Sequence, residues 1–337
     1  MTAAASLPEI QYLDIPNFPF QDGTCLPVAR LAYLDINPTS TKVATIITCF
    51  RGRLQSTLNF ANGALRNHRI IVVALFGNGE SSSPSNTVDF PVEGLSYVDC
   101  VRAQHTLLVA HLQLTSVDIM VGFSMGGQCT YHWLLTYPDF VSAAAILCSS
   151  ARTSRHNYQF LEGPKAALIS SVDYVQGKTE NASCFRGPSP ERGLKAFGKA
   201  YSAWLTSAEW FDRELYQNLG FGSLEAWDEV VAGTNYLTWH PDDLLAKLGM
   251  WQRGDITGLV PIKPASLEGA LGKIKARVLL MPCSTDQYFR WEASASECNL
   301  IPDAQLKVIP SVWGHLAGSG VSEEDTKWMD TALSNFL

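Results

Sequence analysis

Short runs of apolar, β-branched residues alternate with helix-length segments along most of this chain, and this alternation constrains the fold more than any other feature. The clear runs lie at residues 44–50, 69–75, 117–122, 143–148, 277–281 and 306–309. Several are continuously apolar, which is typical of strands buried on both faces of a parallel sheet. Two earlier runs, at 10–15 and 30–36, are joined by a turn at Asp22 and Gly23 and could form an antiparallel edge.

Helix-length segments separate these runs, at about residues 58–66, 92–112, 126–137 and 323–336. Strands that alternate with helices predict a doubly wound α/β sheet. With the two N-terminal runs, we expect a mostly parallel sheet of eight strands with helices on both faces.

The alternation stops after Ser150 and resumes at Arg277. From about residue 151 to residue 268 the chain reads as helical and irregular, and it carries five of the nine tryptophans, at positions 204, 210, 227, 239 and 251. We therefore predict one α/β core, built from residues 1–150 and 268–337, with a helical lid of residues 151–267 inserted into it.

Composition excludes several other classes of protein. The chain carries 25 Lys and Arg against 32 Asp and Glu, and it has no basic run of the kind that a nucleic-acid-binding surface needs. No apolar run approaches the roughly 18 residues of a membrane span. The start of the chain lacks a basic flank followed by an apolar core, so we expect no secretory signal and a cytoplasmic location. The eight cysteines include no C-x-x-C pair, and we expect neither disulfides nor a metal ion.

The segment 122–127 (GFSMGG) follows an apolar run and opens a predicted helix. A serine on so sharp a turn has a strained backbone, and the flanking glycines let the strand and the helix approach without a clash. The Ser124 hydroxyl would then stand at the carboxyl edge of the sheet, under the positive end of the helix dipole. Ser124 is the candidate nucleophile; the alternative is a glycine-rich turn that only packs a helix on a sheet.

A serine hydroxyl is a weak nucleophile and needs a neighbouring base, usually a histidine. Of the seven histidines, His315 follows the last predicted strand and can reach the same sheet edge as Ser124. Asp286 follows the strand at 277–281 and would hold the tautomer of His315. The chain order Ser124, Asp286, His315 is that of α/β-hydrolases. Taken alone, each of the latter two could instead be a capping aspartate or a buried histidine.

An oxyanion that develops on the substrate needs two backbone N–H donors. One is expected from Met125, directly after the nucleophile. The other is expected from the loop after the third predicted strand, with Phe50 as the first candidate and Arg51 as the second.

Over nearly its whole length the chain resembles the homoserine O-acetyltransferase branch of the α/β-hydrolase superfamily. The resemblance rests on residues 122–127, 150–154 with Asn157, 192–196 with 207–211, 286–289 and 309–315, and is closer still to uncharacterised members that carry the segments 76–79 and 81–86. It implies that Ser124 is acylated, that Asp286 and His315 complete a catalytic triad, and that the insertion forms a lid over a tunnel. It also implies a homodimer.

Two departures from that branch concern the substrate. The acetyltransferases place an aspartate directly after the catalytic histidine to hold the homoserine amine, where this chain has Leu316. They also carry an arginine for the substrate carboxylate, where this chain has Gly198, with Lys199 beside it as an imperfect replacement. Since a zwitterion in a dry pocket needs both charges matched, homoserine is disfavoured as a substrate.

The tryptophans of the insertion are expected mainly in its core, but they also favour an apolar substrate pocket. Trp204, Trp239, Tyr288 and Leu316 are the candidate substrate-binding residues.

These features predict a serine-dependent hydrolase of an apolar small-molecule ester or thioester, without a cofactor. One alternative is an O-acyltransferase with acyl-CoA as co-substrate. Another is a protein of the same fold that performs non-hydrolytic chemistry or only binds a ligand; a broken triad would favour the ligand-binding form. Neither a nucleic acid nor a membrane is expected as a partner.

Overall fold

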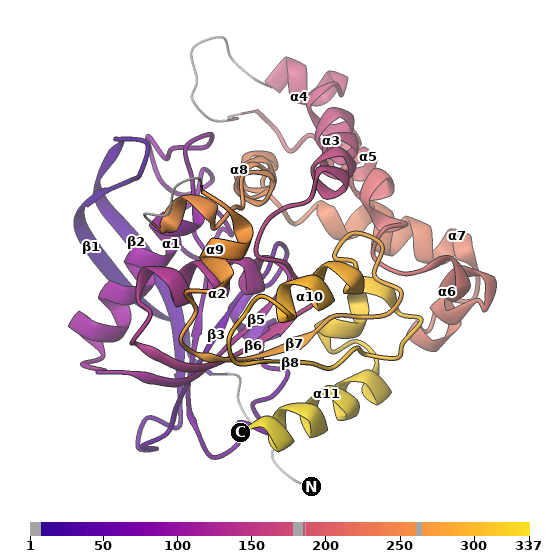
Figure 1. Cartoon of the computed structure of the whole chain (residues 1–337). Coiled ribbons are helices and arrows are strands. Elements are labelled where there is room, and N and C mark those ends of the chain that lie inside the picture. Colours follow the sequence, from indigo (N-terminus) through magenta and orange to yellow (C-terminus); the bar gives the residue numbers. More distant parts are fainter. Residues whose placement is uncertain (1–7, 178–184, 186, 261–264) are drawn as a thin grey trace, which may run out of the picture.

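A computed structural model (Figure 1) describes residues 8–177, 185, 187–260 and 265–337. Its centre is an eight-stranded sheet in the order β1-β2-β4-β3-β5-β6-β7-β8. The strands are β1 (Gln11–Pro19), β2 (Cys25–Ile36), β3 (Val43–Ile47), β4 (Arg69–Val73), β5 (Val117–Phe123), β6 (Val141–Leu147), β7 (Arg277–Met281) and β8 (Ala304–Leu306). From β4 to β8 neighbouring strands are parallel, so the predicted mostly parallel sheet is confirmed.

The first two strands form the antiparallel edge that the sequence suggested. β1 pairs with β2, and β2 pairs antiparallel with β4. In the turn between β1 and β2, Gly23 has φ = +94°, and the carboxylate of Asp22 accepts the N–H of Thr24 at 2.8 Å. Glycine suits this turn because a side chain would strain that backbone conformation.

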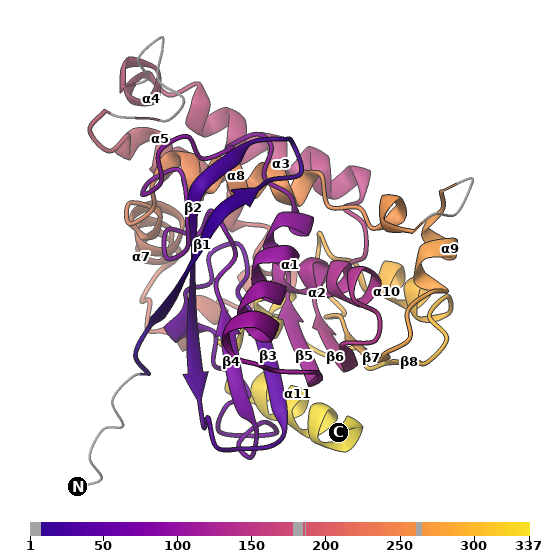
Figure 2. The same ribbon diagram turned by 90° about the vertical axis from the view of Figure 1, so that its left-hand side faces the viewer.

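Helices cover both faces of the sheet. Outside the segment between β6 and β7 the helical elements are η1 (Leu54–Ser56), α1 (Tyr97–His105), η2 (Thr106–His111), α2 (Met125–Thr136), α10 (Trp291–Cys298), η7 (Gly314–Ser319) and α11 (Glu323–Phe336). Met120 of β5 packs in one apolar cluster with Val101 of α1, whereas its neighbour Ile119 packs in a second cluster with Met329 and Leu333 of α11. Successive strand residues therefore serve opposite layers, and Figures 1 and 2 show α11 on the other side of the sheet from α1 and α2.

The segment between β6 and β7 is helical and contains no strand within its described residues. Its elements are α3 (Arg155–Ile169), α4 (Val172–Gly177), α5 (Glu191–Ser202), α6 (Ala208–Asp212), η3 (Leu215–Leu219), α7 (Leu224–Trp227), η4 (Asp228–Gly233), η5 (Thr234–Tyr236), α8 (Pro241–Gln252), η6 (Thr257–Leu259) and α9 (Leu267–Leu271). The boundaries of a lid at residues 151 and 267 stay a prediction.

The insertion packs on the loops that follow several strands. Leu316 N–H donates to the carbonyl of Leu205 at 3.1 Å, and the Gln287 side chain donates to the carbonyl of Thr206 at 2.7 Å. These contacts place the insertion over the carboxyl edge of the sheet. Among the described residues, none of the helices is long and apolar enough to cross a membrane.

The predicted helix at residues 58–66 is wrong, because this segment forms successive turns. A helix would direct the N–H of Ala64 to the carbonyl of Phe60. Instead the carboxylate of Asp330, in α11, accepts that N–H at 2.7 Å. A contact with a distant part of the chain therefore replaces the local hydrogen bond.

Two other boundaries differ from the predicted ones. The helix expected from residue 92 begins at Tyr97, because Ser96 and Asp99 form a capping box in which each side chain accepts the other residue's N–H. The last strand ends at Leu306, and beyond it Ile309 makes only an isolated bridge to Cys283.

Candidate active site

Ser124 stands at the sharp turn between β5 and α2, with φ = +56° and ψ = −123°. The neighbouring glycines make this turn possible. A Cβ on Gly122 would lie 2.3 Å from the carbonyl oxygen of Gly126, and a Cβ on Gly126 would lie 2.5 Å from that of Ile47. The serine is thus held in a strained conformation at the N-terminus of a helix, as a nucleophile turn requires.

His315 joins Ser124 and Asp286. Its Nε2 lies 2.9 Å from Ser124 Oγ, and its Nδ1 lies 2.7 Å from Asp286 Oδ2. A carboxylate can only accept, so Nδ1 carries the hydrogen and Nε2 of the neutral ring is free to accept from the serine hydroxyl. The structure therefore brings together the three residues that the sequence singled out.

The surroundings of the histidine and the aspartate fix their orientation. Asp286 Oδ1 accepts the N–H groups of Tyr288 and Phe289 at 3.1 and 3.0 Å, which leaves Oδ2 directed at His315. The imidazole packs against the rings of Phe123 and Tyr288, whose centroids are 4.7 and 4.3 Å from its own. All three side chains of the set are buried.

The loop after β3 brings a backbone donor beside the serine. Ile47 of β3 pairs with Gly122 of β5, so this loop starts next to the nucleophile turn. Among the described residues, no acceptor is recorded for the N–H of Phe50, whereas that of Arg51 faces the Cys49 sulfur and opposes the rise that burial causes in the thiol pKa. Phe50 is therefore the better of the two predicted donors.

Met125 supplies the second candidate donor. It is the first residue of α2, and a helix leaves the N–H groups of its first turn without an intrahelical acceptor. This N–H directly follows the nucleophile, as expected for one half of an oxyanion hole.

A cavity of about 340 Å³ opens on Ser124 and His315. Arg51 is the one charged side chain among its described lining residues, which include no carboxylate. Its walls include the apolar residues Ile47, Phe50, Phe123, Leu205, Leu316 and Val321 and the polar residues Ser56, Thr57 and Asn59. This composition suits a small neutral molecule with an apolar part.

Of the four predicted substrate-binding residues, one lines the cavity. Leu316 lines the cavity, and Tyr288 packs on His315. Trp204 packs on Phe160, and Trp239 lies under the guanidinium of Arg53 at 4.0 Å; neither belongs to the cavity wall. A contact of these two tryptophans with substrate stays a prediction.

Lys199 does not replace the missing arginine. Its ammonium group pairs with Asp228, and about half of its side chain is exposed at the surface. Gly198 packs so closely on the chain at Ala232 that a Cβ would lie 1.8 Å from that carbonyl oxygen. Neither residue lines the cavity at Ser124.

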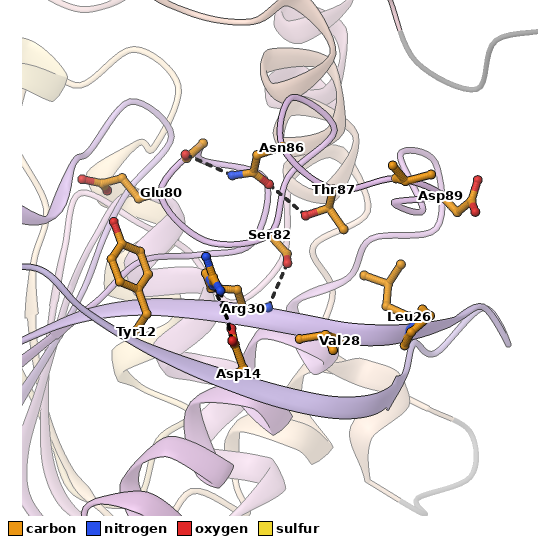
Figure 3. Close-up of a pocket in the computed structure, with 13 residues that line it drawn as sticks. Tyr12, Asp14, Leu26, Val28, Arg30, Glu80, Ser82, Asn86, Thr87 and Asp89 are labelled. Carbon is orange, nitrogen blue, oxygen red and sulfur yellow. Dashed lines mark hydrogen bonds and ion pairs between the residues drawn. The ribbon is translucent and has the colours of Figure 1, made fainter.

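A second, larger hollow lies away from this chemistry, between the β1–β2 hairpin and the loop at 79–89 (Figure 3). Its volume is about 720 Å³. Among its charged and polar groups, Arg30 pairs with Asp14 at 2.7 Å and the Thr87 hydroxyl donates to Asn86 at 2.8 Å. It contains none of the three candidate catalytic residues, so we place the site at the smaller cavity.

Two buried residues near the site were not predicted. The Cys148 sulfur lies within 4.8 Å of the reactive atoms of Asp286 and His315, but burial raises its pKa well above the usual value, and the thiol stays protonated.

Lys247 of α8 donates to the loop that carries Phe50. A single lysine among the apolar residues of 244–251 is the sequence signal that could have revealed it.

A doubly wound sheet with a serine on such a turn, and an acid and a histidine at the same edge, defines the α/β-hydrolase class. The chain belongs to the α/β-hydrolase fold family: the family model described by that name matches residues 46–173. An ethyl acetate hydrolase of Pseudomonas veronii is 31% identical over 97% of this chain and 95% of its own length.

Other relatives agree with the resemblance noted from the sequence. The acetyl esterase MekB superimposes with a TM-score of 0.88 at 30% identity, over 98% of this chain and 96% of its own. A homoserine O-acetyltransferase of Trichormus variabilis is 24% identical over 76% of this chain and 72% of its own. The predicted kinship with homoserine O-acetyltransferases is confirmed, and the comparisons add esterases as relatives.

Proposed function

We propose that this protein is a serine hydrolase of small carboxylic esters that works through an acyl-enzyme on Ser124. The observation that carries this proposal is the continuous chain of hydrogen bonds from Asp286 through His315 to Ser124, with distances of 2.7 and 2.9 Å. A nucleophile, its base and the group that orients the base are thus in contact before substrate binds.

In the first half of the reaction Ser124 Oγ attacks the ester carbonyl while His315 Nε2 takes its proton. Asp286 stabilises the imidazolium that forms. The N–H groups of Phe50 and Met125 stabilise the negative charge on the carbonyl oxygen. His315 then gives the proton to the leaving alcohol, and the acyl group remains on Ser124.

In the second half, water replaces the alcohol. His315 takes a proton from the water, whose oxygen attacks the acyl carbon, and then returns the proton to Ser124 as the carboxylic acid leaves. Every proton transfer uses the same nitrogen, so the reaction needs no cofactor.

The size and polarity of the cavity support a short, neutral substrate. A volume of about 340 Å³ is near the lower end of the range of about 300–1,000 Å³ for small-molecule sites. The wall lacks a carboxylate within the described chain, so the ammonium group of homoserine has no partner there. Two similar proteins, an ethyl acetate hydrolase and an acetyl esterase, point the same way.

An O-acyltransferase is the second candidate, because homoserine O-acetyltransferases are among the relatives. It would share the acyl-enzyme on Ser124 and differ only in its second substrate, an alcohol in place of water, with acyl-CoA as donor. The proposed partners are accordingly small molecules, and a homodimer stays a prediction.

Intact mass spectrometry after brief mixing with p-nitrophenyl acetate tests the proposal, with Ser124→Ala beside the wild type. We expect an acetyl adduct and turnover in the wild type and neither in the variant. Added short alcohols and acetyl-CoA separate the candidates: release as acetate supports a hydrolase, and transfer to the alcohol supports a transferase. Turnover that survives Ser124→Ala would refute both.

A further inference from the structure

Lys247, on α8 of the insertion, is fully buried in an apolar part of the molecule. The aromatic rings of Phe50 and Trp239 lie 5.8 and 5.6 Å from its Nζ. Within the described residues, Nζ of Lys247 donates to two backbone carbonyls and forms no ion pair. Burial lowers its pKa to about 8.

A buried lysine without a carboxylate partner costs stability that an apolar side chain of the same length would not. On the helix itself, Leu248 and Leu244 are buried apolar side chains, and the carboxylate of Asp243, one turn earlier, attracts the ammonium group without forming an ion pair. No carboxylate contacts the ammonium group within the described residues, so its role lies in the groups that it does contact.

The ammonium group contacts the two carbonyls of the loop after β3. Nζ donates to the carbonyl oxygen of Cys49 at 2.8 Å and also to that of Phe50. No other side chain of the described residues donates to either carbonyl, although the backbone N–H of Gly52 approaches Cys49 O at 3.3 Å.

These bonds, together with the longer one from the Gly52 N–H, fix the direction of the Phe50 N–H. The carbonyl of Cys49 and the N–H of Phe50 belong to one planar trans peptide unit, so they point in opposite directions. Because that carbonyl points at Lys247, the N–H of Phe50 points away from α8. The residue that carries it lines the cavity at Ser124.

The chain just beyond this loop is held by a different group. The carboxylate of Glu80 accepts the N–H of Leu54 at 3.0 Å, and the Asn78 carbonyl accepts from Arg53. Those contacts keep residues 53 and 54 in place but do not touch the peptide unit between Cys49 and Phe50. Lys247 is therefore placed to orient that unit.

We propose that Lys247 is a positioning residue for the oxyanion hole, which aims the Phe50 N–H at the acyl oxygen by holding the carbonyls of Cys49 and Phe50. The proposal rests on the proposed function, since it assigns Lys247 a part in the same reaction. It also ties the insertion to the chemistry, because α8 supplies the contact.

Lys247→Met tests this role, because methionine fills a similar space and cannot donate. Loss of an oxyanion donor costs about 10²–10³ in kcat, and a donor that is only misdirected should cost less, so we expect kcat for p-nitrophenyl acetate to fall about 10–100-fold. KM should stay within about twofold, since the loss falls on the transition state. The matched control is Leu248→Ala, which should lower the melting temperature more than Lys247→Met does and leave kcat per folded molecule unchanged.

A second measurement is independent of activity. A crystal structure of Lys247→Met should show the peptide unit between Cys49 and Phe50 rotated or displaced. An unchanged peptide unit, or a kcat equal to the wild-type value, would overturn the proposal. If turnover instead survives Ser124→Ala, the proposed function fails and the role in catalysis fails with it, whereas the crystal structure still decides whether Lys247 orients the loop.

Discussion

Ser124 Oγ and His315 Nε2 lie 2.9 Å apart although 191 positions of the chain separate them. In the sheet, β8 is separated from β5 by two strands, so the chain after β8 must run back across the strand ends to bring His315 to the serine. Close packing makes this return possible: a Cβ on Gly318 would lie 2.7 Å from the Phe123 ring and 2.9 Å from the Cys148 sulfur. The contact between Ser124 and His315 therefore depends on how η7 packs on the ends of β5 and β6.

Asp286→Asn should nearly abolish activity without unfolding the protein. The asparagine can still accept the N–H groups of Tyr288 and Phe289 through its oxygen, but its amide would then face His315 Nδ1 and favour the wrong tautomer. We expect kcat for p-nitrophenyl acetate to fall by about 10⁴, with little change in KM. Asp330→Asn, on the far side of the sheet, is the control and should keep its kcat. A fall of less than about tenfold would show that Asp286 does not orient the base.

The cavity at Ser124 predicts a preference for short acyl groups. Leu205 lines it, so Leu205→Ala should make room for further methylene groups, each of which gains about 0.8 kcal/mol on burial. We expect kcat/KM of the wild type to decrease from acetyl to octanoyl esters. In the variant, kcat/KM for the longer esters relative to that for acetate should rise about tenfold, so that the optimum moves to longer chains.

Leu333→Ala of α11 serves as the control for this change, because it removes the same side chain from an apolar cluster that does not line the cavity. It should lower stability and leave the order of substrates as it is. An unchanged order in Leu205→Ala would mean that the acyl group lies elsewhere.

Substitution of Gly198 should lower the stability of the protein. An arginine at this position, the simplest change towards homoserine binding, is therefore disfavoured. Any side chain there meets the carbonyl oxygen of Ala232, 1.8 Å from the position of a Cβ. We expect Gly198→Ala to lower the free energy of unfolding by about 1–3 kcal/mol, and Gly198→Arg by more. The double variant Gly198→Arg with Leu316→Asp should therefore fail to acetylate homoserine.

Gly258→Ala, in η6, is the matched control, since a Cβ there meets nothing within 4 Å. It should be neutral or slightly stabilising, because alanine loses less backbone freedom on folding than glycine does. Urea denaturation of the three variants measures the difference, and a Gly198→Ala protein as stable as the wild type would contradict the packing described here.

The candidate site residues at strand ends could be predicted from the sequence, because the residues just before each of them in the chain mark its position. Ser124, Asp286 and His315 each follow a run of apolar residues, and parallel strands bring such positions to one edge. Lys247 stands out only as a lone lysine among apolar residues, and this signal does not reveal its partner, because the carbonyl that it binds is 198 positions away and belongs to the backbone. The false helix at 58–66 has the same cause, since Asp330 lies 266 positions from Ala64. Backbone groups bound by distant side chains leave no pattern in the sequence.

Because of Glu297, we expect the free energy of unfolding to decrease as the pH rises towards neutral. Its carboxylate is buried, bonded to the Tyr131 hydroxyl and the N–H of Ala151, and burial raises its pKa from the ordinary 4.5 to about 7. A carboxyl group with a raised pKa in the folded state gives its full contribution to stability below pH 4.5 and loses it as the pH rises through 7. At about 1.4 kcal/mol for each pKa unit, the loss is about 3 kcal/mol.

Glu297→Gln should remove this dependence. The amide oxygen can accept from Ala151, and its NH₂ group can donate to the Tyr131 oxygen, so the buried groups stay paired at any pH. We expect urea denaturation to show equal stability of variant and wild type at pH 5 and a variant more stable by about 1–3 kcal/mol at pH 8. Glu292→Gln, about half exposed on the same helix, is the control and should shift both values by less than about 0.5 kcal/mol. If Glu297→Gln changes stability equally at both pH values, Glu297 does not titrate in this range, and its carboxylate is stabilised by its two partners instead.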